Sequence, residues 1–99
     1  MAYISLSHKN DREVMAELGR RLRALRKAHG LKLSDVAERA ALERRTVSRA
    51  EQGDNPRLET LLRILRVYGR LDALDGFIPE PTVSPMDELR RRRREARDG

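Results

Sequence analysis

Apolar side chains recur every three or four residues over most of the chain, which is the period of an amphipathic helix. Between Asp11 and His29 this spacing is kept by Val14, Leu18, Leu22 and Leu25. Asn10 or Asp11 can cap the start of this predicted helix, and Gly30 can end it in the left-handed conformation. The first predicted helix therefore covers about residues 11–29.

Two shorter amphipathic segments follow, over residues 33–40 and 43–52, and only Ala41 and Leu42 lie between them. Helices joined by so short a link must cross at a large angle, and small side chains such as Ala37 and Ala50 permit a close approach. Gly53 is expected to end the second of these helices. Two short helices joined by a tight turn indicate a helix-turn-helix.

A fourth helix is predicted after the turn at residues 54–56, with Asn55 as N-cap and Pro56 at its first position. Its inward face is expected to consist of Leu58, Leu61, Leu62, Leu65 and Tyr68. A short fifth helix over residues 71–77 carries more apolar surface than one exposed turn should. We therefore expect a dimer surface formed by Leu71, Leu74, Phe77 and Ile78.

The chain divides into three predicted parts. Residues 1–10 form an arm whose alternation at positions 3–6 could pair as an edge strand. Residues 11–78 form the helical domain. Residues 79–99 contain Pro79, Pro81 and Pro85, then a helix start and the run Arg90 to Arg94, so we expect a connector and an arginine-rich tail.

Composition agrees with a small all-α protein, because 99 residues with only three aromatic side chains allow a single small core. The net charge is +6, and it is not spread evenly. The segment from position 20 to 49 contains ten basic and three acidic residues, so the remainder of the chain is close to neutral. A local basic surface of this kind is typical of proteins with a polyanionic partner.

Other chemistries find little support in the sequence. Cysteine is absent, and His8 and His29 lie far apart without a ligand spacing, so we expect no metal site and no cofactor. No glycine-rich phosphate loop or nucleophile motif is present, and we expect no enzymatic activity. No apolar run approaches the length of a membrane span. We expect a cytoplasmic, nucleoid-associated protein.

The segment from Leu31 to Gly53, LKLSDVAERAALERRTVSRAEQG, resembles the helix-turn-helix of the phage-repressor (XRE) class of transcriptional regulators. The resemblance continues through the helix after Pro56 and covers about residues 18–77. The matching positions include Leu31, Val36, Ala37, Leu42, Thr46, Val47, Ser48, Arg49, Glu51 and Gly53. Three positions depart from the pattern: Lys32-Leu33 replaces Thr-Gln, Ala41 replaces the turn glycine, and Glu43 replaces a serine. The resemblance implies a compact five-helix domain that binds duplex DNA.

In this class the second short helix lies in the major groove and its outward side chains contact base edges. Val47 and Ala50 are expected to face the core. The resemblance implies base contacts by the side chains on the other side and at the helix start, namely Arg44, Arg45, Arg49 and Glu43. Arginine there would pair best with guanine, and glutamate could accept from a cytosine amino group.

Further residues are expected to position the protein on the DNA backbone or to hold the domain together. The phosphate contacts implied are Lys32, Thr46, Ser48, Asn55 and Arg57, with Thr46 and Ser48 also possible local caps. The resemblance also implies that the carboxylate of Glu51 forms a structural ion pair with Arg26 on the first helix.

The leading interpretation is a dimeric repressor of a palindromic operator, since one recognition helix reads too few base pairs for genomic specificity. One alternative is an antitoxin that represses its own operon and binds a HipA-like kinase toxin, because the segment FIPEPTVSPMDELRRRRRE resembles tails of such regulators. Others are a controller of a restriction-modification operon and binding to nucleic acid without sequence choice.

Overall fold

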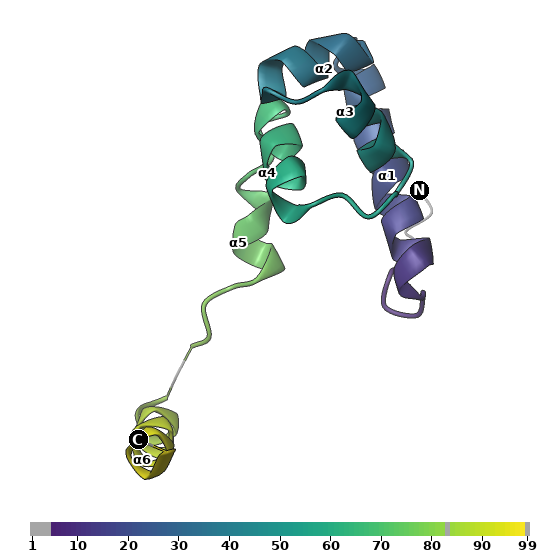
Figure 1. The fold of residues 1–99 in the computed structure, drawn as a ribbon. Coiled ribbons are helices and arrows are strands. Elements are labelled where there is room, and N and C mark those ends of the chain that lie inside the picture. The colour runs from purple at the N-terminus through teal and green to yellow at the C-terminus, as the bar shows by residue number, and fades with distance from the viewer. Residues whose placement is uncertain (1–4, 83, 99) are drawn as a thin grey trace.

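The computed structural model describes residues 5–82 and 84–98, without the side chain of residue 98, and within these residues all regular structure is helical. The six helices are α1 (Asp11–Ala28), α2 (Leu33–Ala40), α3 (Arg44–Glu51), α4 (Leu58–Val67), α5 (Ala73–Phe77) and α6 (Pro85–Asp98). Figure 1 shows α1 to α5 grouped together, with α6 apart from them at the end of an extended connector. The all-α prediction is confirmed; of the expected edge strand, residues 3 and 4 lie outside the described residues, and residues 5 and 6 are not in a strand.

The ends of α1 follow from local hydrogen bonding. Of the two candidate caps, Asn10 occupies the N-cap: its Oδ1 accepts from the backbone N–H of Glu13 at 2.9 Å, and the Glu13 carboxylate accepts from the N–H of Asn10 at 3.4 Å. At the other end Gly30 adopts φ +66°, and the N–H of Leu31 reaches back to the carbonyl of Arg26 at 3.1 Å. This left-handed glycine turns the chain from α1 into α2.

The turn between α2 and α3 has the left-handed residue that the helix-turn-helix pattern requires. Ala41 has φ 55° and ψ 47°, and the N–H of Leu42 donates to the carbonyl of Ala37 at 2.9 Å. A side chain in this conformation costs about 1 kcal/mol or more relative to glycine. The replacement of the usual glycine by Ala41 is therefore a local strain that the packing of α2 against α3 must offset.

The core lies where α2, α3 and α4 meet, and α1 closes it by packing against α3. Val36, Val47 and Ile64 are 0–1% exposed and form its centre, one from each of these three helices. Leu22 of α1 and Tyr68 at the end of α4 complete it. Burying an aliphatic side chain of this kind contributes roughly 1.5–3 kcal/mol, so the core fixes α3 on its inner face.

Helix α4 differs from the prediction in its start and in its rotation. It begins at Leu58 with Arg57 as N-cap, so the predicted capping role of Asn55 is wrong: Asn55 has φ 40° and belongs to the preceding loop. The buried line is Thr60, Ile64 and Tyr68, while Leu58 is 64% exposed. Because α4 packs against both α2 and α3, Thr60 and Ile64 lie in the buried face, while the predicted Leu61 and Leu65 pack against the core only partly buried.

Candidate nucleic-acid interface

Helix α3 is anchored by small and aliphatic side chains and exposes its arginines. Val47 and Ala50 are 0% and 1% exposed. With 100° between successive residues of a helix, Arg45 and Arg49 fall on the opposite side from them. All three predicted base-contact arginines, Arg44, Arg45 and Arg49, are exposed.

Glu43, the fourth predicted base-contact residue, occupies the N-cap of α3. Its backbone carbonyl accepts from the N–H groups of Thr46 at 3.0 Å and Val47 at 3.3 Å, while its side chain makes no capping hydrogen bond. The carboxylate is exposed. A free acid beside the positive end of a helix is electrostatically favourable for the helix itself.

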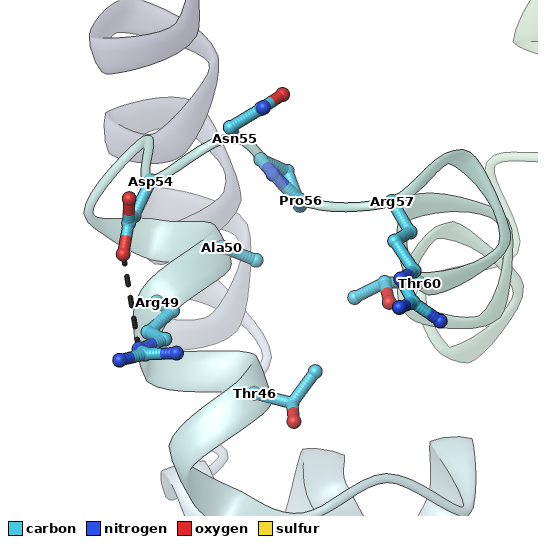
Figure 2. Close-up of a pocket in the computed structure, with 8 residues that line it drawn as sticks. All are labelled: Thr46, Arg49, Ala50, Asp54, Asn55, Pro56, Arg57 and Thr60. Atoms are coloured by element: carbon cyan, nitrogen blue, oxygen red, sulfur yellow. Dashed lines mark ion pairs between the residues drawn. The ribbon is translucent and has the colours of Figure 1, made fainter.

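A groove with a volume of about 310 Å³ separates α3 from the start of α4. Figure 2 shows Thr46, Arg49 and Ala50 reaching it from α3, and Arg57 and Thr60 reaching it from the start of α4, with residues 54–56 joining the two sides. Three of the predicted phosphate contacts, Thr46, Asn55 and Arg57, are therefore brought together in one groove. The other two, Lys32 and Ser48, do not line it.

Arg49 carries an acidic neighbour at the edge of this groove. Its Nε lies 3.7 Å from Oδ2 of Asp54, and the two side chains are 54% and 63% exposed (Figure 2). The distance is longer than a hydrogen bond, and an exposed pair of this kind contributes at most about 1 kcal/mol. Arg49 is therefore held only weakly and could exchange Asp54 for another anion.

Lys32 and Ser48 have local roles next to this surface. Lys32 is the exposed N-cap of α2, and its backbone N–H donates to the carboxylate of Asp35 at 2.8 Å. The Ser48 hydroxyl accepts from the side-chain amide of Gln52 at 3.3 Å. Asp35 thereby supplies one half of a capping box, and the half that a threonine hydroxyl at position 32 would supply is missing.

Arg26 and Glu51, the two residues expected to pair, form a two-pronged contact between α1 and the end of α3. Arg26 Nε donates to one carboxylate oxygen at 2.8 Å and its second nitrogen donates to the other at 3.0 Å. These hydrogen bonds raise the pKa of the Arg26 guanidinium against the opposing effect of burial. A third bond, from Arg26 to the carbonyl of Leu31 at 3.1 Å, ties the α1–α2 loop to the pair.

Gly19 and Gly53 bring α1 against the end of α3. Gly53 was predicted only to end a helix, and Gly19 had no predicted role. A Cβ on Gly19 would lie 2.5 Å from the Glu51 carbonyl oxygen, and one on Gly53 would lie 2.6 Å from that of Met15. The signal was available, because an isolated glycine inside a helix costs about 1 kcal/mol and usually has a packing reason. This contact sets the position of α3 on the domain.

The predicted dimer residues lie in and around α5. Leu71 and Leu74 are half-buried, whereas Phe77 and Ile78 are 70% and 76% exposed. The fifth helix is shorter than predicted, because residues 71 and 72 form a turn. Phe77 ends the helix as predicted, and the apolar side chains at this end, Phe77 and Ile78, stand at the surface.

Among the described residues, no three or more His, Cys, Asp or Glu side chains are grouped so that they could hold a metal ion. In the same part of the chain no helix combines the length and the apolar character needed to cross a membrane.

A short first helix, a left-handed turn residue and a second helix with a buried inner face define a helix-turn-helix. The family model of the helix-turn-helix domain matches residues 17–75, and the chain belongs to this family. It is also 33% identical over 75 residues to a protein of Pyrococcus horikoshii named as an HTH-type transcriptional regulatory protein. The match covers 75% of this chain and 21% of that protein, so the chain spans about a fifth of the relative's length. The resemblance to helix-turn-helix regulators is thereby confirmed.

Proposed function

We propose that the chain is a transcriptional regulator that binds duplex DNA sequence-specifically, with α3 in the major groove. The observation that carries the proposal is the opposite placement of side chains on α3: Val47 and Ala50 fix one side to the core, while Arg45 and Arg49 project from the other. An eight-residue helix held in this way offers arginines to base edges without unfolding any part of the domain. The regulatory role named for the Pyrococcus horikoshii relative supports the same function.

The groove between α3 and α4 supplies the backbone contacts in this proposal. Arg57 precedes the first turn of the ten-residue helix α4, where free N–H groups and the helix dipole favour a phosphate. Thr46 faces the same space from α3. Lys32 and Ser48 would extend the phosphate contacts along α2 and α3, while Glu43 and Arg44 stand at the base-facing end of α3.

The experiment that tests the function is selection of binding sites from random duplexes, followed by binding of Arg45→Ala and Arg49→Ala to the selected duplex. Each substitution is expected to cost about 1–3 kcal/mol and to relax the choice at particular base pairs. Arg12→Ala, an exposed arginine on α1, is the matched control and should retain the selectivity. No preference of the wild type for the selected duplex over a shuffled one at equal salt would contradict the proposal.

We further propose that the chain acts as a homodimer on a palindromic operator, through Phe77 and Ile78 together with Leu71 and Leu74. Apolar side chains that are 70% and 76% exposed at the end of α5 gain most from being covered by a second copy. Sedimentation of the wild type should show a dimer that Phe77→Glu dissociates, while Leu58→Glu, at another exposed apolar position, leaves it intact. A monomeric wild type that binds a kinase-type toxin through the C-terminal tail would favour the antitoxin alternative instead.

A further inference from the structure

Helix α6 separates its arginines into a neutralised side and a free side. Two glutamates account for the neutralised side: Glu88 accepts from Arg91 at 2.6 Å and from Arg92 at 3.1 Å, and Glu95 accepts from Arg91 at 2.6 Å. All three contacts follow the three- and four-residue spacing of a helix. The guanidiniums of Arg91 and Arg92 are therefore already occupied within α6.

The remaining arginines of α6 share the other side. Positions 90, 93, 94 and 97 have the spacing of one helical face, because they follow each other by three, one and three residues. Arg90 has only a long contact of 3.9 Å with Asp87. Within the described residues Arg93, Arg94 and Arg97 form no ion pair, and all four side chains are exposed.

We infer that this arginine face, formed by Arg90, Arg93, Arg94 and Arg97, is a second DNA-binding surface that holds the phosphate backbone beside the site read by α3; the inference rests on the proposed function. The face is about 11 Å long at 1.5 Å per residue. Duplex DNA carries one phosphate charge per about 1.7 Å of its axis, so roughly six phosphates lie along that length. Arginine matches phosphate geometry well and stays charged.

The connector gives α6 the reach that this role requires. The seven residue steps from Ile78 to Pro85 can span at most about 25 Å. Figure 1 shows residues 79–82 extended, with α6 beyond them. Tethering at this range keeps the arginine face near any duplex that α3 occupies, so it adds affinity as a linked second contact. Because it meets only backbone, it adds no sequence choice.

DNA fits this face better than the other polyanionic surfaces do. A helix that binds membranes needs a broad apolar side with large residues, whereas Met86 and Leu89 are the only large apolar side chains of α6. The family of the domain and the basic excess between residues 20 and 49 favour a nucleic acid as the polyanion that this chain binds. Binding to acidic vesicles is an outcome of the test.

The test compares two double variants of the full chain that remove equal charge from α6. Arg93→Gln with Arg94→Gln removes free arginines, and Arg91→Gln with Arg92→Gln removes paired ones; glutamine preserves helix propensity. The probe is the selected duplex with 20 base pairs of mixed sequence on each side, titrated between 50 and 200 mM salt. The free-face variant should reduce the slope of log K against log salt by about 2. The paired-face variant should reduce it by less than half as much.

The outcomes separate this inference from the proposed function. If the wild type prefers the selected duplex but the two variants give the same slope, or the free-face variant keeps the wild-type slope, the inference is overturned. The inference is also overturned if the free-face variant loses binding to phosphatidylserine vesicles but keeps its binding to DNA. If the wild type has no preferred duplex, the proposed function fails. Circular dichroism of both variants checks α6, and Arg93→Lys with Arg94→Lys should retain most of the slope, because the charge is kept.

Discussion

Arg26 on α1 and Glu51 at the end of α3 form a nearly buried ion pair, with side chains 12% and 7% exposed and a shortest contact of 2.8 Å. The pair joins the first helix of the domain to the helix that we propose to enter DNA. Because Arg26 also bonds the carbonyl of Leu31, it connects α1, the loop before α2 and α3. The ion pair therefore stabilises the fold. We expect that its loss weakens DNA binding only because the domain unfolds more readily.

Removing either partner of this pair should destabilise the domain strongly. Arg26→Ala or Glu51→Gln would leave a buried charge or acceptor without its partner, which typically costs about 3–5 kcal/mol. Urea denaturation should show this loss for each single variant. The double variant Arg26→Met with Glu51→Leu should lose less than the two single losses together, because no buried charge remains. Single variants as stable as the wild type would contradict the prediction.

Gly19→Ala should destabilise the domain although alanine is the better helix former. The new Cβ would lie 2.5 Å from the carbonyl oxygen of Glu51 and 2.8 Å from the backbone nitrogen of Gly53. Both are backbone atoms that cannot turn away, so α1 and α3 must separate, at a cost of about 1–3 kcal/mol. Gly76→Ala in α5 is the control, because a Cβ there meets nothing within 4 Å. It should be neutral or gain up to about 1 kcal/mol. Equal urea midpoints for the two variants would argue against the contact.

Much of this architecture was predictable from the sequence. The Asn10 cap and the glycine after α1 depend on residues close together in the chain, and the turn position at Ala41 was indicated by the family resemblance. The start and the rotation of α4 were not predictable, because both depend on how α4 meets α2 and α3. Asn55 and Pro56 have the composition of a helix start, yet the chain uses them to bridge the groove beside α3.

In the candidate interface, too, some features were predictable from nearby residues and others depend on contacts between distant segments. The exposed arginines of α3 followed from the spacing of Val47 and Ala50, which is local. The acid beside Arg49 did not, because Asp54 reaches back from the loop after α3. The contact of Gly19 with the end of α3 depends on packing between segments more than thirty residues apart, which no pattern within α1 can specify.

Ala41→Gly should stabilise the domain. Ala41 is left-handed at φ 55°, and glycine removes the clash between Cβ and backbone that costs about 1–2 kcal/mol. Glycine also makes the unfolded chain more flexible, which lowers the free energy of unfolding by up to about 1 kcal/mol. A net gain of roughly 0.5–1 kcal/mol in the free energy of unfolding is therefore expected in urea denaturation. Ala28→Gly, at the right-handed last residue of α1, is the control and should lose stability. A loss at both positions would show that Ala41 is not strained.

Tyr68→Phe should keep or increase stability at neutral pH. The Tyr68 hydroxyl is buried and has no hydrogen-bond partner among the described residues, so phenylalanine removes a desolvation cost of about 1 kcal/mol. The ring contact with His29, at 5.2 Å between centroids, is preserved. A loss larger than about 1 kcal/mol in urea denaturation would show that the hydroxyl has a partner in solution.

The same substitution should change the alkaline limb of the stability curve. Burial raises the pKa of Tyr68 above its ordinary value of 10.0. Because the folded-state pKa exceeds the unfolded-state pKa, this contribution is fully present below about pH 10 and is lost as pH rises through the folded-state pKa. Urea midpoints measured from pH 9 to 11 should fall more steeply for the wild type than for Tyr68→Phe. Parallel curves would contradict the shift.

Asp54→Asn should increase DNA affinity. The Asp54 carboxylate lies 3.7 Å from Arg49 Nε at the edge of the groove that would face the DNA backbone. Its removal frees Arg49 from a weak pair and takes away a charge that repels phosphate, so affinity for the selected duplex should rise about two- to fivefold at fixed salt. Asp72→Asn, the same charge change outside the groove, should have a smaller effect in the same anisotropy titration. A fall in affinity for Asp54→Asn alone would mean that Asp54 orients Arg49 for binding, and Arg49 would then be a positioned contact rather than a free one.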